Sequence, residues 1–302
     1  MPSILSLQQI TKFYGALCAL DQVSFEVPAH SIFGILGPNG SGKTTLLGTV
    51  TDVLKPASGT YRWFEKPPDH RLRKQIGTLL ETPNFYPYLS AEDNLYINAA
   101  IKGCDRKEVA RVLRLVGLSG RSRSLFRTFS LGMKQRMALA SAMLGDPPVV
   151  VLDEPTNGLD PVGIADIRAL IQQMGENGKT VIMASHLLDE VEKVCTHVAI
   201  LKKGKLLASG PVSEILTSEE VIEMAATGMD RLREVISAHP AVKTARLSGD
   251  TLQVVLNTPV ESEALNRYCF DHQIILSLLR KKKKSLELKF IELTGEPVLK
   301  NK

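Results

Sequence analysis

The chain has 302 residues, of which 44% are hydrophobic and 23% are charged, and its formal net charge is +5 at pH 7. This composition is that of an ordinary globular protein and excludes a disordered chain, while the length favours two domains. Much of the positive charge lies in one run, Arg280–Lys284, so the spread basic surface of a nucleic-acid-binding protein is not indicated. The run is interpreted as a solvated turn, with attraction to anionic lipid head groups as the alternative.

The cysteines and the N-terminus indicate the compartment. The four cysteines are far apart and include no C-x-x-C pair, which predicts reduced thiols rather than a zinc site or a disulfide framework. The first residues show no basic segment followed by an apolar one, and no window of the chain is apolar for long enough to span a bilayer. We therefore expect a cytoplasmic protein.

The first half of the chain changes from strand patterns to helical ones. Residues 3–35 read as short strands, the last of which is the apolar run Ile32–Leu36 followed by glycine. Helical patterns occupy residues 90–143, and we interpret residues 84–145 as a mostly helical insert.

Apolar strands return in the second half, at Val149–Leu152, Thr180–Ala184 and Val198–Leu201. Continuous apolar strands separated by helical sequence predict an α/β fold with a parallel sheet covered on both faces. After Gly210 the expected order is a strand at 221–226, a helix at 229–238, strands at 243–248 and 251–256, a helix at 261–271, a strand at 274–279 and a helix from about 285. This order predicts a small ferredoxin-like α+β domain at 216–302 after a larger domain at 1–215.

A phosphate-binding loop follows the strand Ile32–Leu36. The segment Gly37–Thr44 matches G-x-x-x-x-G-K-[ST] in full and precedes a predicted helix, so the motif has the context that its chemistry requires. Lys43 is expected at the β- and γ-phosphates, and the Thr44 hydroxyl is expected to bind Mg²⁺. The predicted phosphate-binding residues are Gly37, Pro38, Asn39, Gly40, Ser41, Gly42, Lys43, Thr44 and Thr45.

Two adjacent carboxylates end the strand Val149–Leu152. Asp153 stands where a Walker-B carboxylate binds Mg²⁺. Glu154 follows it, and strand alternation predicts that its side chain points to the other side, where it could polarise a water for attack on the γ-phosphate. A solvated strand cap is the alternative interpretation of this pair.

Further motifs in fixed order resemble the ABC transporter ATPase family. The segment Phe129–Arg136 is similar to the family's signature L-S-G-G-Q, Pro155–Asp160 looks like its D-loop, and Ala184–His186 looks like its switch histidine. Tyr14 matches the aromatic residue that stacks on adenine. Each of these pieces is weak alone, because Ser130 is also a good helix N-cap and Tyr14 also suits a packing role.

The resemblance covers residues 3–215 and implies a Walker-A P-loop ATPase core, with an antiparallel β-subdomain and a helical subdomain, that acts as a homodimer. Two such domains would close over two ATP molecules, with Ser130 and Gly132 of one subunit at the γ-phosphate held by the other. It also implies that Asp160 lies at the nucleotide and that His186 acts in catalysis with Glu154 and Lys43.

The signature and the Q-loop depart from the common family pattern. Leu131 replaces the first glycine of the signature, and Met133 replaces its glutamine. Glu81 stands where the Q-loop glutamine is expected, so it keeps an oxygen for Mg²⁺ but adds a negative charge near the triphosphate. A loop carboxylate that faces solvent is the alternative. These departures resemble the bacitracin- and lantibiotic-export and gliding-motility ATPases.

The resemblance implies a separate integral-membrane permease as partner and a position on the inner face of the cell membrane. Export is implied only by likeness to that subfamily. Aromatic residues in Phe85–Leu89 suit contact with a permease helix or packing of the insert equally well. The C-terminal domain is expected to serve in dimerisation or regulation. Two other functions stay open: a soluble ABC-type ATPase acting on ribosomes or DNA, and a regulatory subunit that binds ATP without hydrolysing it.

Overall fold

The computed structural model describes residues 2–80, 84–216, 221–258 and 260–282, together with Leu286, Lys289, Phe290 and Leu293. The chain divides into two compact units, an N-terminal unit over Met1–Val212 and a C-terminal unit over Ser213–Pro297. Glu81 lies outside the described residues, and so does most of the helix expected from about 285.

A three-stranded antiparallel sheet begins the N-terminal unit. Its strand order is β2-β1-β4, and its strands are β1 (Ser3–Tyr14), β2 (Leu17–Pro28) and β4 (Ser58–Trp63). Buried and exposed residues alternate along much of β2, because one face packs on the core and the other meets solvent. Gly15, with φ of 57°, makes the tight turn between β1 and β2.

A six-stranded sheet forms the centre of the same unit. Its order is β5-β6-β7-β3-β8-β9, and β9 alone is antiparallel to its neighbour. Its strands are β3 (Ile32–Leu36), β5 (Ile76–Leu79), β6 (Val149–Asp153), β7 (Thr180–Ser185), β8 (His197–Lys202) and β9 (Lys205–Pro211). Every residue of β3, β6 and β7 is buried, as continuous apolar strands predict for a sheet with two covered faces.

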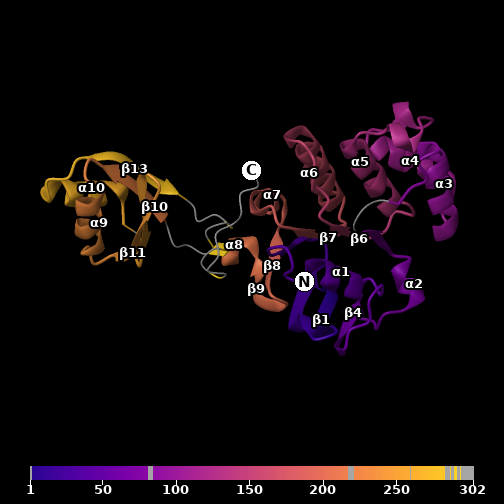
Figure 1. The fold of residues 1–302 in the computed structure, drawn as a ribbon, viewed down its shortest axis with the longest axis horizontal. Coiled ribbons are helices and arrows are strands. Elements are labelled where there is room, and N and C mark those ends of the chain that lie inside the picture. Colours follow the sequence, from indigo (N-terminus) through magenta and orange to yellow (C-terminus); the bar gives the residue numbers. More distant parts are fainter. Residues whose placement is uncertain are drawn as a thin grey trace. The chain divides into compact units, whose positions relative to one another are not determined.

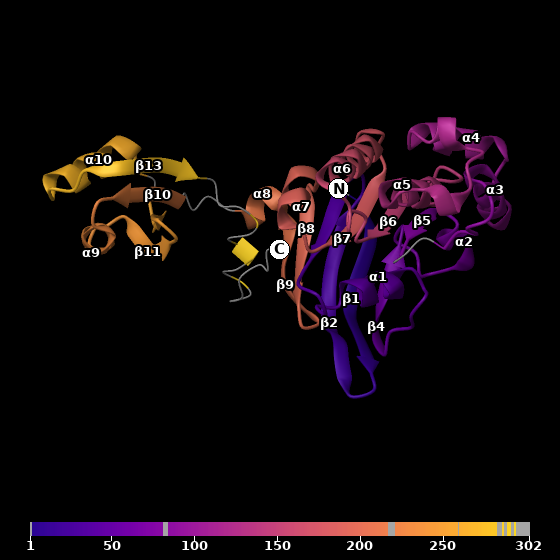
Figure 2. The same cartoon turned by 45° about the horizontal axis from the view of Figure 1, so that its top comes forward.

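Helices cover the central sheet on both faces (Figure 1, Figure 2). Helix α1 (Lys43–Val50) lies between this sheet and the three-stranded one, and its leucines share one core with both sheets. Helices α6 (Pro161–Glu176) and α7 (Leu188–Val194) lie on the opposite face. This arrangement confirms the predicted α/β P-loop fold.

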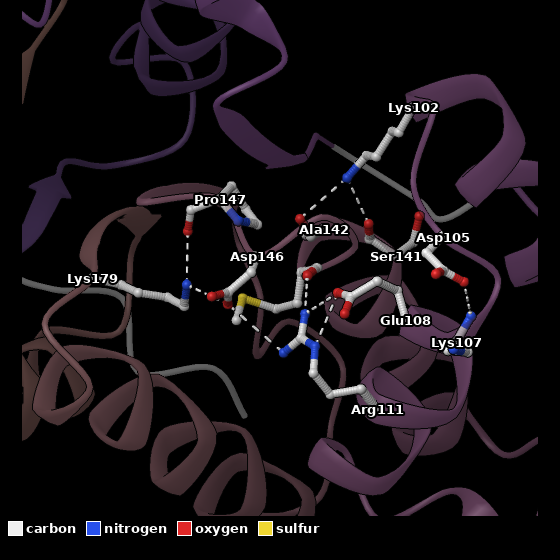
Figure 3. Close-up of polar contacts among 11 residues, drawn as sticks. Lys102, Asp105, Lys107, Glu108, Arg111, Ser141, Ala142, Asp146, Pro147 and Lys179 are labelled. Carbon is white, nitrogen blue, oxygen red and sulfur yellow. Dashed lines mark hydrogen bonds and ion pairs between the residues drawn. The ribbon is translucent and has the colours of Figure 1, made fainter.

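The helical insert consists of α3 (Ala91–Lys102), α4 (Lys107–Leu115) and α5 (Leu131–Ala142), with short helices α2 (His70–Arg73), η1 (Ser119–Arg121) and η2 (Phe126–Thr128) before and between them. Cations hold the C-terminal end of α5 (Figure 3). Lys102 Nζ donates to the carbonyls of Ser141 at 2.7 Å and Ala142 at 3.2 Å. Positive charge is favourable at the carbonyls that end a helix, although burial lowers the pKa of Lys102.

The C-terminal unit is a four-stranded antiparallel sheet of order β11-β12-β10-β13 with two helices. Its elements are β10 (Val221–Ala226), α9 (Met229–Ser237), β11 (Val242–Ser248), β12 (Thr251–Leu256), α10 (Ser262–Asp271) and β13 (Leu276–Lys282), after the short helix α8 (Val212–Ile215). The β-α-β-β-α-β sequence with the last strand beside the first is the ferredoxin-like arrangement. Apolar residues from the sheet and both helices form its own core.

Candidate functional site

The phosphate-binding loop joins β3 to α1, and two of its glycines are sterically required. Gly42 has φ of 104°, and a Cβ there would lie 2.6 Å from the carbonyl oxygen of Ala19. A Cβ on Gly37 would lie 2.3 Å from Ser41 Oγ. The backbone therefore approaches its neighbours too closely for a side chain at either position.

A cavity of about 470 Å³ opens in front of this loop. Eight of the predicted site residues line it, and the others that line it come from the start of β2 and from the turn after β8. The lining residues are Tyr14, Leu17, Cys18, Ala19, Asn39, Gly40, Gly42, Lys43, Thr44, Thr45, Glu154 and Lys203. Gly37, Pro38 and Ser41 belong to the same loop without lining the cavity.

Sequence reasoning missed four lining residues. Leu17, Cys18 and Ala19 follow the turn after Tyr14, so their proximity to the residue predicted to stack on adenine was a usable signal. Lys203 lies far along the chain, in the turn between β8 and β9, and no motif marks it.

Lys43 is buried against the loop that carries it. Its Nζ donates to the carbonyls of Gly37 at 2.9 Å and Pro38 at 3.4 Å. The same nitrogen lies 3.4 Å from Glu154 Oε1. The loop motif and the end of β6 thus meet through one cation and one carboxylate.

Glu154 is oriented by its backbone, not by strand alternation as the sequence predicted. Strand β6 ends at Asp153, and Glu154 has a left-handed backbone with φ of 47°. Its amide donates to the carbonyl of Ala184 at 3.0 Å, which fixes this turn against the end of β7. The alternation rule fails because it holds only while the backbone remains extended.

His186 completes a row of three charged or polar groups. Its Nδ1 lies 2.8 Å from Glu154 Oε2, so an imidazole protonated at Nδ1 donates to the carboxylate. The carboxylate therefore has Lys43 on one oxygen and His186 on the other. Neither partner saturates it, because each carboxylate oxygen accepts more than one hydrogen bond.

The oxygen donors in the site suit Mg²⁺ bound together with a phosphate. Thr44 is exposed in the cavity, and Asp153 is buried at the carboxyl end of β6. A hydroxyl and a carboxylate are hard oxygen donors, and Mg²⁺ commonly takes one or two protein oxygens alongside phosphates and water. The described part of the chain holds no group of three or more His, Cys, Asp or Glu side chains arranged for a metal, so a cage built from protein side chains alone is not what these residues offer.

The signature and D-loop residues lie at helix starts outside the cavity lining. Ser130 caps α5, with its Oγ accepting from the Met133 amide at 3.3 Å. Asp160 caps α6, with its Oδ1 accepting from the Gly163 amide at 3.0 Å. Neither residue, nor Gly132, is among the residues that line this chain's cavity.

Leu131 links these two motifs within the chain. Its Cδ2 would lie 3.2 Å from a Cβ built on Gly158. The residue nevertheless remains 53% exposed. The leucine that departs from the signature pattern therefore packs against the D-loop of its own chain.

Comparisons with known proteins agree with the motif order. The ABC transporter family model matches residues 20–157. A bacitracin transport ATP-binding protein of Bacillus licheniformis is 33% identical over 301 residues, which cover 98% of each chain. A lantibiotic transport ATP-binding protein of Streptococcus pyogenes is 33% identical over 68% of this chain and 89% of its own.

Solved structures show the same fold. A dimeric ATP-binding cassette in a post-hydrolysis state, bound to ADP and Pi, is similar with a TM-score of 0.62 and 26% identity, over 69% of this chain and 99% of that one. The fold, the phosphate-binding loop and the full-length relatives agree. The chain belongs to the family of ABC transporter ATP-binding subunits and is an ATPase of that family, as the order of its motifs predicted.

Proposed function

We propose that the chain hydrolyses Mg·ATP in the cavity in front of α1, as one half of a homodimer, and that this reaction drives export through a separate membrane permease. The observation that carries the catalytic part is the position of Glu154. It lies 3.4 Å from the lysine of the phosphate-binding loop and 2.8 Å from His186. A carboxylate so placed beside a triphosphate can act as general base toward water.

Each residue has a distinct task in this proposal. Lys43 exchanges its loop carbonyls for the β- and γ-phosphates, and the amides at the start of α1 bind the phosphates that lie beside them. Glu154 accepts the proton of the attacking water, and the His186 imidazole orients the carboxylate. Tyr14, exposed at 47% on the cavity rim, stacks on adenine.

Thr44 and Asp153 hold Mg²⁺ in this proposal, and Glu81 is a further candidate ligand. The ion would neutralise charge on the phosphate oxygens. The support from this chain is the donor chemistry of the hydroxyl on α1 and of the buried carboxylate that ends β6.

The dimer is proposed because the signature residues do not line their own chain's cavity. Ser130 caps α5 and Gly132 lies in its first turn, so this helix N-terminus can receive an anion. Asp160 caps α6 with a carboxylate, so in this proposal it lies near the nucleotide without binding phosphate. A second copy would bring its Ser130 and Gly132 to the γ-phosphate in this chain's cavity. The similar cassette of known structure is a dimer, which supports this arrangement.

The permease and the direction of transport rest on the relatives, whose names describe bacitracin, lantibiotic and Nod factor transport or export. Within the described residues, no helix has both the length and the apolar character needed to cross a bilayer. We propose attachment to the inner face of the membrane through the permease. Tyr86 and Tyr88 are exposed and suit that contact, whereas Phe85 packs on Phe126 with ring centroids 5.0 Å apart.

The test of the catalytic assignment is Glu154→Gln, which keeps the shape of the side chain and removes its basicity. Steady-state phosphate release should fall by about 10²- to 10⁴-fold, the usual contribution of a general base. ATP binding should persist, and size-exclusion chromatography in ATP should show a trapped dimer. Glu176→Gln, an exposed residue at the end of α6, is the matched control. Equal turnover in wild type and Glu154→Gln would show that Glu154 is not the base, and equal background rates would support a regulatory subunit without turnover.

The partner is tested separately, by affinity purification of the full chain from detergent-solubilised membranes. A polytopic membrane protein should co-purify in stoichiometric amount. Recovery of ribosomes or DNA in its place would contradict the transporter assignment and favour a soluble ABC-type ATPase.

A further inference from the structure

The turn between β8 and β9 carries a lysine to the rim of the cavity. Lys202 pairs with Lys205 across the two strands, so the turn itself consists of Lys203 and Gly204. Both have positive φ, at 48° and 79°, as in a type I′ turn. Lys203 is exposed and lines the cavity.

Backbone contacts fix this turn against the phosphate-binding loop. The Gly204 amide donates to the carbonyl of Ser41 at 3.0 Å, and its own carbonyl accepts from the Asp21 amide at 2.9 Å. A Cβ on Gly204 would lie 2.8 Å from the carbonyl oxygen of Ala19. The position of the turn therefore does not depend on the side chain of Lys203.

The local chemistry of the turn does not account for a lysine at position 203. Asn and Gly are favoured at the first central residue of a type I′ turn, and a left-handed backbone is unfavourable for a long side chain. The other charged lining residues, Lys43 and Glu154, lie 3.4 Å from each other. Lys203 forms no ion pair within the described part of the chain, so its charge is not neutralised by a neighbouring carboxylate.

We propose that Lys203 is a further nucleotide-binding residue, whose ammonium binds the α-phosphate of ATP. The inference rests on the proposed occupation of the cavity by ATP. In that arrangement Tyr14 holds the adenine end and Lys43 the β- and γ-phosphates. The turn lies between these ends, because Gly204 lies close to Ala19 on one side and to Gly42 on the other. The Cα of Gly204 would lie 3.7 Å from a Cβ on Gly42.

Lys203→Met should raise KM for ATP about three- to tenfold, the range expected when a partly solvated ion pair with phosphate is removed. The dissociation constants of ADP and AMP should rise by the same factor, because both keep the α-phosphate. The value of kcat should change less than KM, since the contact is the same in the ground state and the transition state. Lys203→Arg should restore most of the affinity.

Lys205→Met is the matched control. Lys205 belongs to the same hairpin and has the same charge, but its Nζ lies 3.4 Å from Asp21 and it does not line the cavity. Calorimetric titration of ADP and AMP into the full chain, with steady-state ATPase assays, gives the constants. Thermal unfolding of each variant checks that the fold is retained.

The outcomes separate this inference from the proposed function. If wild type binds ATP but Lys203→Met and Lys205→Met give equal constants, Lys203 is not a nucleotide-binding residue. A loss confined to ATP, with ADP and AMP unchanged, would overturn the α-phosphate assignment. If instead the wild-type chain binds no ATP, or Lys43→Ala binds it as tightly as wild type, the proposed function itself fails.

Discussion

Replacing Gly42 by alanine should damage the phosphate-binding loop far more than replacing Gly40, although both glycines have positive φ, at 104° and 78°. A Cβ on Gly40 meets no atom within 4 Å, so Gly40→Ala incurs only backbone strain of about 1 kcal/mol. A Cβ on Gly42 would lie 2.6 Å from the carbonyl oxygen of Ala19, a backbone atom in β2. The cost of displacing a packed strand adds to the backbone strain, so Gly42→Ala should lower the free energy of unfolding by about 2–5 kcal/mol.

Urea unfolding without nucleotide measures this difference, with the fluorescence of Trp63 as the signal. Trp63 is the single tryptophan of the chain. It is buried, and its indole N–H donates to Val50 at the end of α1, at 2.7 Å. With m-values of about 1–3 kcal/mol per molar urea, Gly40→Ala should lower the midpoint by about 0.3–1 M and Gly42→Ala by at least twice as much. Equal midpoints for the two variants would refute the steric argument and leave only the shared backbone strain.

Two further substitutions test the caps and charges around α5. Ser130→Asp should keep the α5 cap and the unfolding free energy, because Asp is as good an N-cap as Ser. It should nevertheless slow ATP hydrolysis, because the added carboxylate repels the γ-phosphate. Unchanged turnover would argue against contact of Ser130 with phosphate. The hydrogen bond from Lys179 lowers the pKa of Asp146, so this pair stabilises the fold above the unfolded pKa, and its contribution is lost as pH falls through the lower folded pKa. Asp146→Asn should therefore reduce the unfolding free energy by less than about 1 kcal/mol at neutral pH, because Asp146 is largely exposed. The difference from wild type should shrink below about pH 4. A constant difference across pH would contradict the ion pair.

Local sequence predicted the parts of the fold whose signals lie within a few residues. The buried run Ile32–Leu36 is β3 as its apolar pattern indicated, and the C-terminal elements lie within a few residues of the expected positions, with the last strand at Leu276–Lys282. The orientation of Glu154 could not be predicted in this way. Its left-handed turn is held by a hydrogen bond to Ala184, a residue of another strand.

The sequence by itself determined the phosphate-binding loop, the adjacent carboxylates at and just after the end of β6, and the family, because each depends on residue types at short fixed spacing. Only the tertiary structure decided which distant side chains share the cavity. Lys43 meets Glu154 because α1 packs beside β6 and β7 in one core. Lys203 reaches the same cavity because parallel pairing of β3 with β8 places the turn after β8 beside the loop after β3. Strand pairing between distant segments follows from burial of the whole sheet, and no local pattern around residue 203 encodes it.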